Sequence, residues 1–302
     1  MGKIPVLVLA FNRADHVVEA MKAIREYKPE RIYLECDGAR PHKAGEKKAV
    51  EETRKAMLDA VDWQCDVKTL FRDENLGCAN AVYGAISWFF EHEEYGIICE
   101  DDIVLSQDFF RLCEDLLPRY KSVEKVMEIS ARNESFRTDI PDTYVYAQCF
   151  HCWGWATWRR AWSKMDMSMS AAPRLSLLYM IRHLGIFRGS MMKWYNWHDY
   201  HNLEKCTSWA TRWFLSILDN DGLVIIPGVN LAINIGMDGG EHYNSEYEDP
   251  FEGLTLGRLN WPIRYDDSLV LDKKQKQYDN FSFAKMRYVG LKKKIFHQHG
   301  RS

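Results

Sequence analysis

Three consecutive carboxylates, Glu100–Asp101–Asp102, directly follow the apolar run Gly96–Cys99. A short apolar run of this kind is typical of a buried strand. Like charges at the end of a buried strand repel one another and are poorly solvated, which costs free energy. A divalent cation such as Mg²⁺ or Mn²⁺ removes that cost, because it prefers carboxylate oxygens and shares its coordination shell with substrate phosphates. The sequence therefore predicts a cation site here, with an exposed acidic turn as the alternative.

Polar residues also follow other strand-like runs in the first hundred residues. Strands are expected over 4–10, 31–36 and 67–71, with helices over 15–28, 43–61 and 78–92. This alternation predicts an α/β fold, with a mainly parallel sheet and helices on its faces. Ligands of such sheets bind beyond the carboxyl ends of the strands. We therefore expect one crevice to collect the residues that follow the strands, namely Arg13, Asp37, Arg72, Asn75 and Asp102.

The common nucleotide-binding motifs are missing from the expected position. The first strand is followed by Phe11–Asn12–Arg13, with neither a GxGxxG pattern nor a Walker lysine loop. A nicotinamide enzyme and a P-loop ATPase are therefore not expected. The phosphates of a nucleotide would have to be held in another way, and a cation at the three acids is the available candidate.

The composition of the chain argues against several classes of protein. A chain of 302 residues with 46% apolar content can bury a substantial core. A formal net charge of −3 gives no indication of a nucleic-acid partner. No apolar run approaches the roughly 20 residues of a membrane span, and no signal peptide is recognisable. The eight cysteines are scattered, as expected of reduced thiols, so we expect a cytoplasmic protein.

Two later segments are open to alternative interpretations. Four tryptophans in the block Trp153–Trp162 could belong to the core or form a stacking wall for sugar rings. From Lys273 to Ser302, nine basic residues against one acid interleave with apolar ones. Such a basic amphipathic segment suits an anionic membrane surface, and a solvated tail or an oligomer contact is the alternative.

The chain resembles the GT-A glycosyltransferases, which use a nucleotide-diphosphate sugar as donor. It is most similar to bacterial polysaccharide enzymes related to the N-acetylglucosaminyltransferase I type. The resemblance covers most of residues 4–245. Its most specific parts are the DXD-like triplet Glu100–Asp102 followed by Asp108–Phe110, and the Trp-Gly-Trp block that begins at Trp153.

The resemblance implies a role for each matching residue. Asp102 would ligate Mn²⁺ or Mg²⁺ together with His242, on a glycine-rich loop (234–242) that folds over the diphosphate. Trp155 would border the sugar and the acceptor. The other residues implied to bind the nucleotide sugar are Arg13, Asp37, Arg72, Asn75, Glu100 and Asp101.

The implied reaction inverts the anomeric carbon. The cation neutralises the departing diphosphate, and a carboxylate base activates the acceptor hydroxyl. Related enzymes often carry an aspartate within or just before the second tryptophan segment, where this chain has Thr207 and Ala210. The base is therefore expected elsewhere, and the candidates are Asp199, Asp238 and Glu241.

The resulting prediction is a metal-dependent hexosyl- or N-acetylhexosaminyltransferase of cell-surface polysaccharide synthesis. It would act on a glycan or lipid-linked glycan acceptor, and would be peripheral at the inner face of the membrane. The expected GT-A domain spans 1–265, with a nucleotide-binding half (about 1–107), an acceptor half (about 108–265) and a helical insertion (about 170–206). A basic segment, 266–302, follows. The alternatives are a sugar-nucleotidyltransferase, which would need a basic glycine-rich loop after the first strand, and a non-catalytic carbohydrate- or membrane-binding module.

Overall fold

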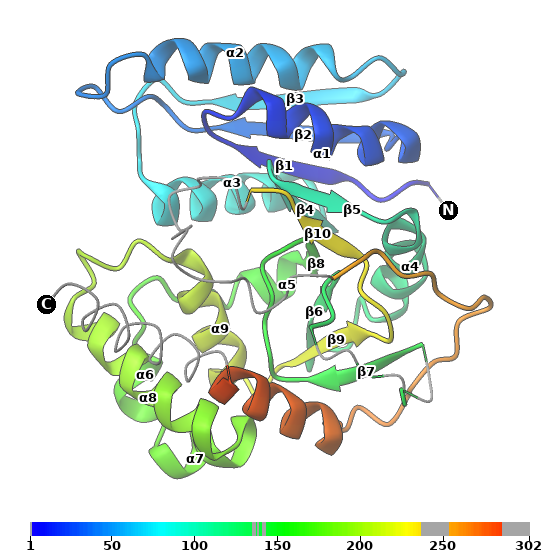
Figure 1. The fold of residues 1–302 in the computed structure, drawn as a ribbon, viewed down its shortest axis with the longest axis vertical. Helices are drawn as coiled ribbons and strands as arrows, with labels where there is room; N and C mark the ends of the chain where they lie inside the picture. Colours follow the sequence, from blue (N-terminus) through cyan, green and yellow to red (C-terminus); the bar gives the residue numbers. More distant parts are fainter. Residues whose placement is uncertain (1, 135–136, 138, 141–142, 237–253, 286–302) are drawn as a thin grey trace, which may run out of the picture.

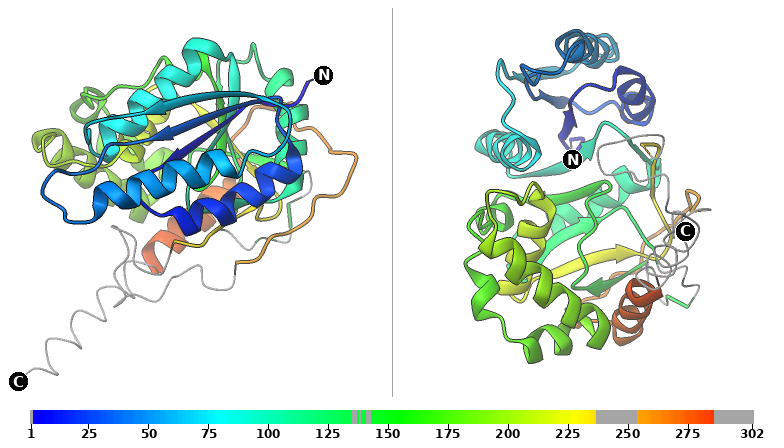
Figure 2. Two further views of the ribbon diagram at one scale, coloured as in Figure 1. Left: turned by 90° about the horizontal axis from the view of Figure 1, so that it is seen from above. Right: turned by 60° about the vertical axis from the view of Figure 1, so that its left-hand side comes forward.

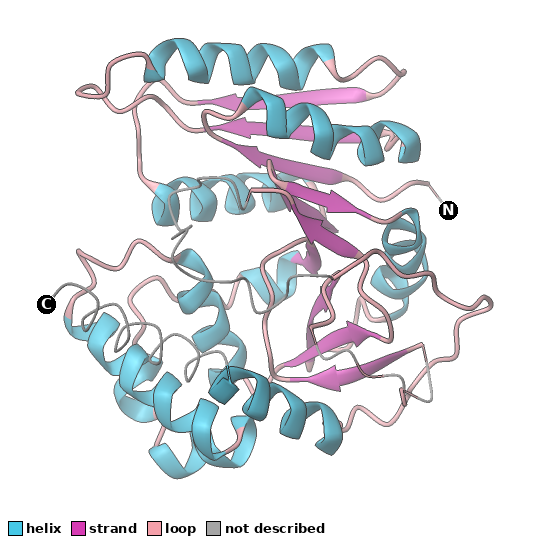
Figure 3. Ribbon diagram, viewed as in Figure 1, coloured by secondary structure: helices cyan, strands magenta, loops and turns pink. Residues whose placement is uncertain are grey.

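A computed structural model shows an α/β fold built on one eight-stranded sheet (Figures 1 and 3). It describes residues 2–134, 137, 139–140, 143–236 and 254–285. The strands of the large sheet, in spatial order, are β3 (Asp66–Phe71), β2 (Arg31–Cys36), β1 (Val6–Ala10), β4 (Tyr95–Glu100), β8 (Trp155–Trp158), β6 (Val126–Ser130), β9 (Leu223–Pro227) and β7 (Tyr144–Ala147). The expected α/β class is confirmed.

Helices cover both faces of the sheet (Figure 2). One face packs against α1 (Ala14–Tyr27), α2 (Glu46–Asp59) and α4 (Gln107–Arg119). The other packs against α3 (Cys78–His92), α5 (Arg159–Trp162) and α9 (Trp209–Asp219). A sheet covered on both faces has no wet side, which is why β1 is apolar and buried at every position.

The first four strands form a parallel set at one side of the sheet. β1 pairs in parallel with β2 on one side and β4 on the other, and β3 pairs in parallel with β2. The carboxyl ends of these strands therefore share one edge of the sheet. Arg13, Asp37, the segment after Phe71 and the acidic triplet all lie at that edge, as the alternation of strands and helices predicts.

The tryptophan block crosses the middle of the sheet. β8 runs antiparallel between β4 and β6, with Ala156 beside both Ile97 and Ile129. Trp155, Trp158 and Trp162 are buried in the core. For these three tryptophans the core interpretation is correct and the stacking wall is not.

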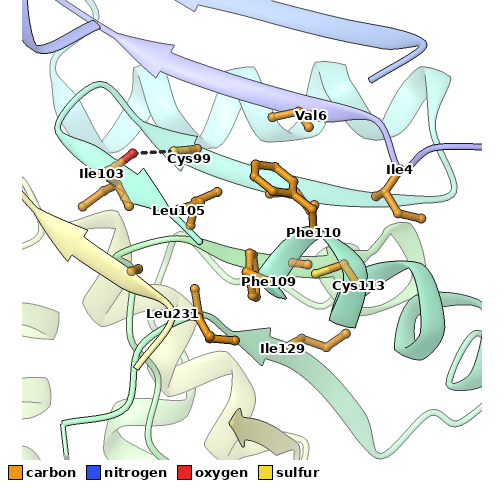
Figure 4. Close-up of a cluster of buried hydrophobic side chains, with 14 of the residues drawn as sticks. Ile4, Val6, Cys99, Ile103, Leu105, Phe109, Phe110, Cys113, Ile129 and Leu231 are labelled. Carbon is orange, nitrogen blue, oxygen red and sulfur yellow. Dashed lines mark hydrogen bonds between the residues drawn. The ribbon is translucent and has the colours of Figure 1, made fainter. Parts of the chain in front are cut away.

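A dense apolar cluster lies beside the acidic triplet (Figure 4). Phe109 and Phe110 of α4 pack there among side chains from β1, β4 and β5 (Ile103–Leu105). The Cys99 thiol donates a hydrogen bond of 3.3 Å to the carbonyl oxygen of Ile103, across the chain reversal that contains Asp101 and Asp102. The reversal is therefore anchored on both sides by buried side chains.

A small second sheet brings a distant segment to the same reversal. β10 (Ala232–Asn234) pairs antiparallel with β5, and the amide of Ile235 donates to the carbonyl oxygen of Asp102 at 2.8 Å. The start of the glycine-rich loop thus lies against the acidic turn.

The expected insertion contains three helices, α6 (Ala171–Arg174), α7 (Leu177–Leu184) and α8 (Ile186–His201). A helix over 273–285 packs against the junction between α7 and α8 (Figure 1). Its Asn280 side chain accepts hydrogen bonds from the amides of Phe187 and Arg188, at 2.9 and 3.1 Å, and so caps α8. The described part of the basic segment is thereby packed on the body of the protein. No helix within the described residues combines the length and apolarity needed to cross a membrane.

Candidate functional site

The acidic turn is a buried corner that one arginine holds. Asp101 and Asp102 are 4% and 8% exposed, so the exposed-turn alternative is wrong. Arg13, the residue before α1, donates from one guanidinium nitrogen to both carboxylates, at 2.9 Å to Asp102 Oδ2. The sheet brings these three residues together as expected, and their ion pairs offset part of the cost of burying the acids.

The corner carries less negative charge than its three acids suggest. Burial raises the pKa of Glu100 to about 8, and Asp102 and Asp101 add to the rise. Burial likewise raises the pKa of Asp101 to about 6, against the opposing effect of Arg13. At neutral pH Glu100 is therefore mostly protonated and can donate a hydrogen bond to a ligand hydroxyl.

One oxygen of the corner remains without a partner. Asp102 Oδ1 is buried and accepts no hydrogen bond from any described residue. Gly236 packs directly against Asp102 and Arg13, because a Cβ at that position would lie 2.2 Å from Asp102 Oδ2 and 2.8 Å from Arg13 Nη1. Burying such an oxygen unpaired is costly, and a cation would remove the cost.

The described residues alone do not build a complete metal cage. No cluster of three or more His, Cys, Asp or Glu side chains within them is arranged to hold a metal ion. A Mg²⁺ or Mn²⁺ site needs only one or two carboxylates when substrate phosphates and waters supply the other ligands. Asp102 fits that kind of site. Asp238, Glu241 and His242 lie outside the described residues, so their roles stay predictions.

Asp37 and Asn75 form a second group at the same edge. The Asp37 carboxylate accepts hydrogen bonds from the amides of Leu76 and Gly77 at 3.1 and 3.2 Å, and from the Asn75 side chain at 3.0 Å. Asn75 also donates to the carbonyl oxygen of Gly38 at 2.8 Å. The structure brings both predicted residues together, and in it their polar groups fix the loop before α3.

Arg72 is directed away from the acidic corner. Its guanidinium lies 3.5 Å from Glu35 and beside Gly84 of α3, on the face of the sheet that α3 covers. Burial raises the pKa of Glu35 to about 8, although Arg72 opposes this rise. The expectation that Arg72 joins the crevice is therefore not met. A position at the end of a strand determines the edge of the sheet at which a residue lies, but not the face towards which its side chain points.

Trp155 does not border a ligand site in this structure. It is fully buried and stacks on Trp209, with ring centroids 5.6 Å apart. This corrects the role expected of Trp155, because a side chain without exposed surface offers no face to a sugar. Trp153 is half-buried instead and packs under Arg132, whose guanidinium carbon lies 3.3 Å from the ring centroid.

Asp199, the predicted base within the described residues, lies on the helical insertion. It is on α8, where its carboxylate is 3.2 Å from His198 Nδ1 and beside the thiol of Cys206. These neighbours belong to the insertion and its exit, and none belongs to the acidic corner. The structure does not bring Asp199 to Asp102.

A cleft of about 250 Å³ lies next to the corner. Its lining comes from the segments after β6 and before β8, from α8 and from the first turn of α9; it comprises Arg132, Glu134, Phe150, His151, Cys152, Trp153, Arg188, Met192, Ala210, Thr211 and Phe214. Glu100 connects the two regions: it accepts a hydrogen bond from Trp209 and adds to the rise that burial causes in the pKa of Cys152.

Sequence reasoning missed the charged residues of this cleft. Arg132 and Glu134 follow β6, so the strand-end rule that selects Arg13 and Asp102 would have selected them as well. Arg188 gives no such signal, because it reaches the cleft from a helix of the insertion.

No protein-family model and no curated protein matches the sequence. Among solved structures, HddC from Yersinia pseudotuberculosis aligns at 11% identity over 52% of this chain and 77% of HddC, with a TM-score of 0.32. HddC complexed with GMP-PN aligns at 12% identity over 48% of this chain and 60% of that one, with a TM-score of 0.29. The glycosyltransferase GlyE of Streptococcus pneumoniae TIGR4 aligns at 12% identity over 58% of this chain and 41% of GlyE, with a TM-score of 0.31. Likenesses this shallow assign no family.

Proposed function

We propose that the protein is a metal-dependent glycosyltransferase that takes its sugar from a nucleotide-diphosphate donor. The observation that carries the proposal is Asp102 Oδ1, a buried carboxylate oxygen without a partner among the described residues, at the carboxyl end of a parallel sheet. The resemblance of the sequence to GT-A enzymes supports the same assignment of this corner.

The residues of the corner divide the work of donor binding. Asp102 would hold Mn²⁺ or Mg²⁺, with His242 as the further ligand that the resemblance implies. A bound cation supplies charge neutralisation for the leaving diphosphate. Arg13 fixes the two aspartates. Glu100 would form a hydrogen bond with a sugar hydroxyl, which can both donate to and accept from a carboxyl group.

The adjacent cleft would hold the acceptor, a glycan or lipid-linked glycan. Its apolar lining suits the C–H faces of sugar rings, and Glu100 places it next to the donor corner. The inverting course and a part in cell-surface polysaccharide synthesis are proposals that rest on the resemblance. The catalytic base is sought among Asp238 and Glu241, because Asp199 lies apart from the corner.

The alternatives make different predictions. A sugar-nucleotidyltransferase would need a basic glycine-rich loop after β1, where this chain has Phe11–Asn12–Arg13. A carbohydrate-binding module would bind sugars without a nucleotide or metal.

The experiment is a thermal-denaturation panel of UDP-, GDP-, CMP- and dTDP-sugars with Mn²⁺ or with EDTA. We expect at least one nucleotide-diphosphate sugar to raise the melting temperature with Mn²⁺ only. If every compound leaves it unchanged while free oligosaccharides raise it, the binding module is the better description.

A further inference from the structure

The cleft beside the donor corner carries an excess of positive charge. We propose that it binds an acidic group of the acceptor, a phosphate or a carboxylate. That the ligand is an acceptor rests on the proposed function, whereas the anion site itself follows from the side chains. Among the described residues, the charged groups that line the cleft are Arg132, Arg188, His151 and Glu134.

One carboxylate, Glu134, faces all three cations. Glu134 Oε1 lies 2.5 Å from Arg132 Nε and 3.3 Å from His151 Nδ1. Burial opposes the ionisation of Glu134, but His151 and Arg132 lower its pKa to about 2. Burial also lowers the pKa of His151, yet Cys149 and Glu134 raise it above its ordinary value overall. The imidazole therefore favours its charged form more than a free histidine does.

Arg188 is the third cation. Burial lowers its pKa, but Cys149, Asp279 and Glu134 face the guanidinium and raise the pKa overall. Its guanidinium carbon lies 5.8 Å from the ring centroid of Phe214, and its Nε is buried without a hydrogen-bond partner among the described residues. Asp279 is an acid behind it, outside the lining of the cleft, and burial raises the pKa of that carboxyl. A buried cation without full pairing is costly, and an anion in the cleft would remove the cost.

The first turn of α9 adds to the same field. Thr211 and Ala210 line the cleft at the amino end of this 11-residue helix, where partial positive charge accumulates. Phe150, Trp153 and Phe214 complete an apolar wall. A site with positive charge beside an apolar wall suits a small acidic group attached to a sugar ring.

A nucleophilic thiol is the other interpretation of this cluster. Cys149 Sγ lies 3.2 Å from His151 Nε2, so the order thiol, imidazole, carboxylate is present. Cys149 is only 2% exposed and does not line the cleft. The cavity that it does line holds about 10 Å³, which is too little for a substrate. The geometry favours anion binding.

The test titrates the full-length protein with sodium phosphate, glucuronate or glucose in EDTA, and follows binding by isothermal titration calorimetry. We expect both anions to bind and glucose, the neutral control, to bind more weakly than either. Tighter phosphate binding would indicate a lipid-phosphate acceptor, and tighter glucuronate binding an acidic sugar. Equal affinities for glucose and the two anions would overturn the proposal.

A matched pair of variants isolates the charge. Thr211→Glu places a carboxylate in the cleft and suits the first turn of a helix, whereas Thr211→Gln adds nearly the same volume without charge. We expect Thr211→Glu to bind the anions at least about tenfold more weakly than Thr211→Gln. Equal affinities of the two variants would contradict the proposal.

A second pair of variants tests the positive charge of Arg188. Arg188→Gln should weaken anion binding, and Arg182→Gln, at an exposed position of α7, should not. Asp102→Asn should bind both anions as the unaltered protein does, because no metal or nucleotide takes part. The proposed anion site and the proposed donor corner are therefore tested independently. Equal losses of anion binding in Arg188→Gln and Arg182→Gln would count against the anion site alone.

Discussion

At the scale of single residues, the donor corner is defined by the protonation of its acids. Arg13 pairs with Asp101 and Asp102, whereas no arginine of the described residues forms an ion pair with Glu100. Burial and the two neighbouring aspartates raise the pKa of Glu100 to about 8, so the folded protein binds a proton that the unfolded chain releases near its ordinary pKa. The cost of ionising Glu100 therefore grows as the pH rises from about 4.5 to about 8.

Replacing Glu100 with glutamine should flatten this pH dependence. The folded state of the unaltered protein holds more protons between these two pKa values, so its free energy of unfolding falls with rising pH. We expect Glu100→Gln to be more stable than the unaltered protein at pH 8.5, with little difference at pH 4.5. Urea denaturation at both pH values measures this, and a constant difference between the two proteins would contradict the raised pKa.

The strand-end rule predicts residues at this scale only in part. It places Arg13, Asp101 and Asp102 together, and Asp37 with Asn75, because parallel strands end at one edge. It fails for Arg72, which turns to the α3 face towards Glu35.

At the scale of elements, the sheet is built from local signals and completed by distant pairings. Alternating apolar runs and amphipathic segments predict β1 to β4 and the helices between them. The insertion of β8 between β4 and β6, and the pairing of β5 with β10, join segments far apart in the chain. No local pattern encodes either pairing, so the approach of the glycine-rich loop to Asp102 is expected only from the resemblance. The same pairing of β8 buries Trp155.

Truncating Trp155 should therefore damage stability as a core substitution does. We expect Trp155→Ala to lower the free energy of unfolding by about 3–5 kcal/mol, through lost contacts and a cavity. Trp194→Ala is the control at a 58% exposed tryptophan, and should change stability by no more than about 0.5 kcal/mol. Chemical denaturation of both variants gives the comparison. Similar small losses would show that Trp155 is not a core residue.

At the scale of the whole molecule, the donor corner lies beside the cleft proposed to bind anions, and the helix over 273–285 packs on the insertion. The helix over 273–285 is held there by Asn280, and Arg137 pairs with Asp272 at 2.8 Å. This part of the basic segment contributes to the fold, so a membrane contact has to be tested with the residues beyond it.

Ending the chain after residue 285 tests the predicted membrane contact. The truncation removes Lys292, Lys293 and Lys294 while keeping the helix that caps α8. We expect binding to vesicles rich in phosphatidylserine to fall, because juxtamembrane basic residues contribute about 1 kcal/mol each. Co-sedimentation at low and high salt measures it. Unchanged binding by the truncated protein would refute this role of the segment.

The central claim is that Asp102 holds a cation that in turn holds a sugar donor through its diphosphate. Isothermal titration calorimetry of the stabilising nucleotide sugar, with Mn²⁺ or EDTA, tests it on Asp102→Asn and on Asp73→Asn, an exposed aspartate at the same edge of the sheet. We predict that binding requires Mn²⁺, is lost in Asp102→Asn and is retained in Asp73→Asn. Donor binding by Asp102→Asn with the affinity of the unaltered protein would contradict the claim.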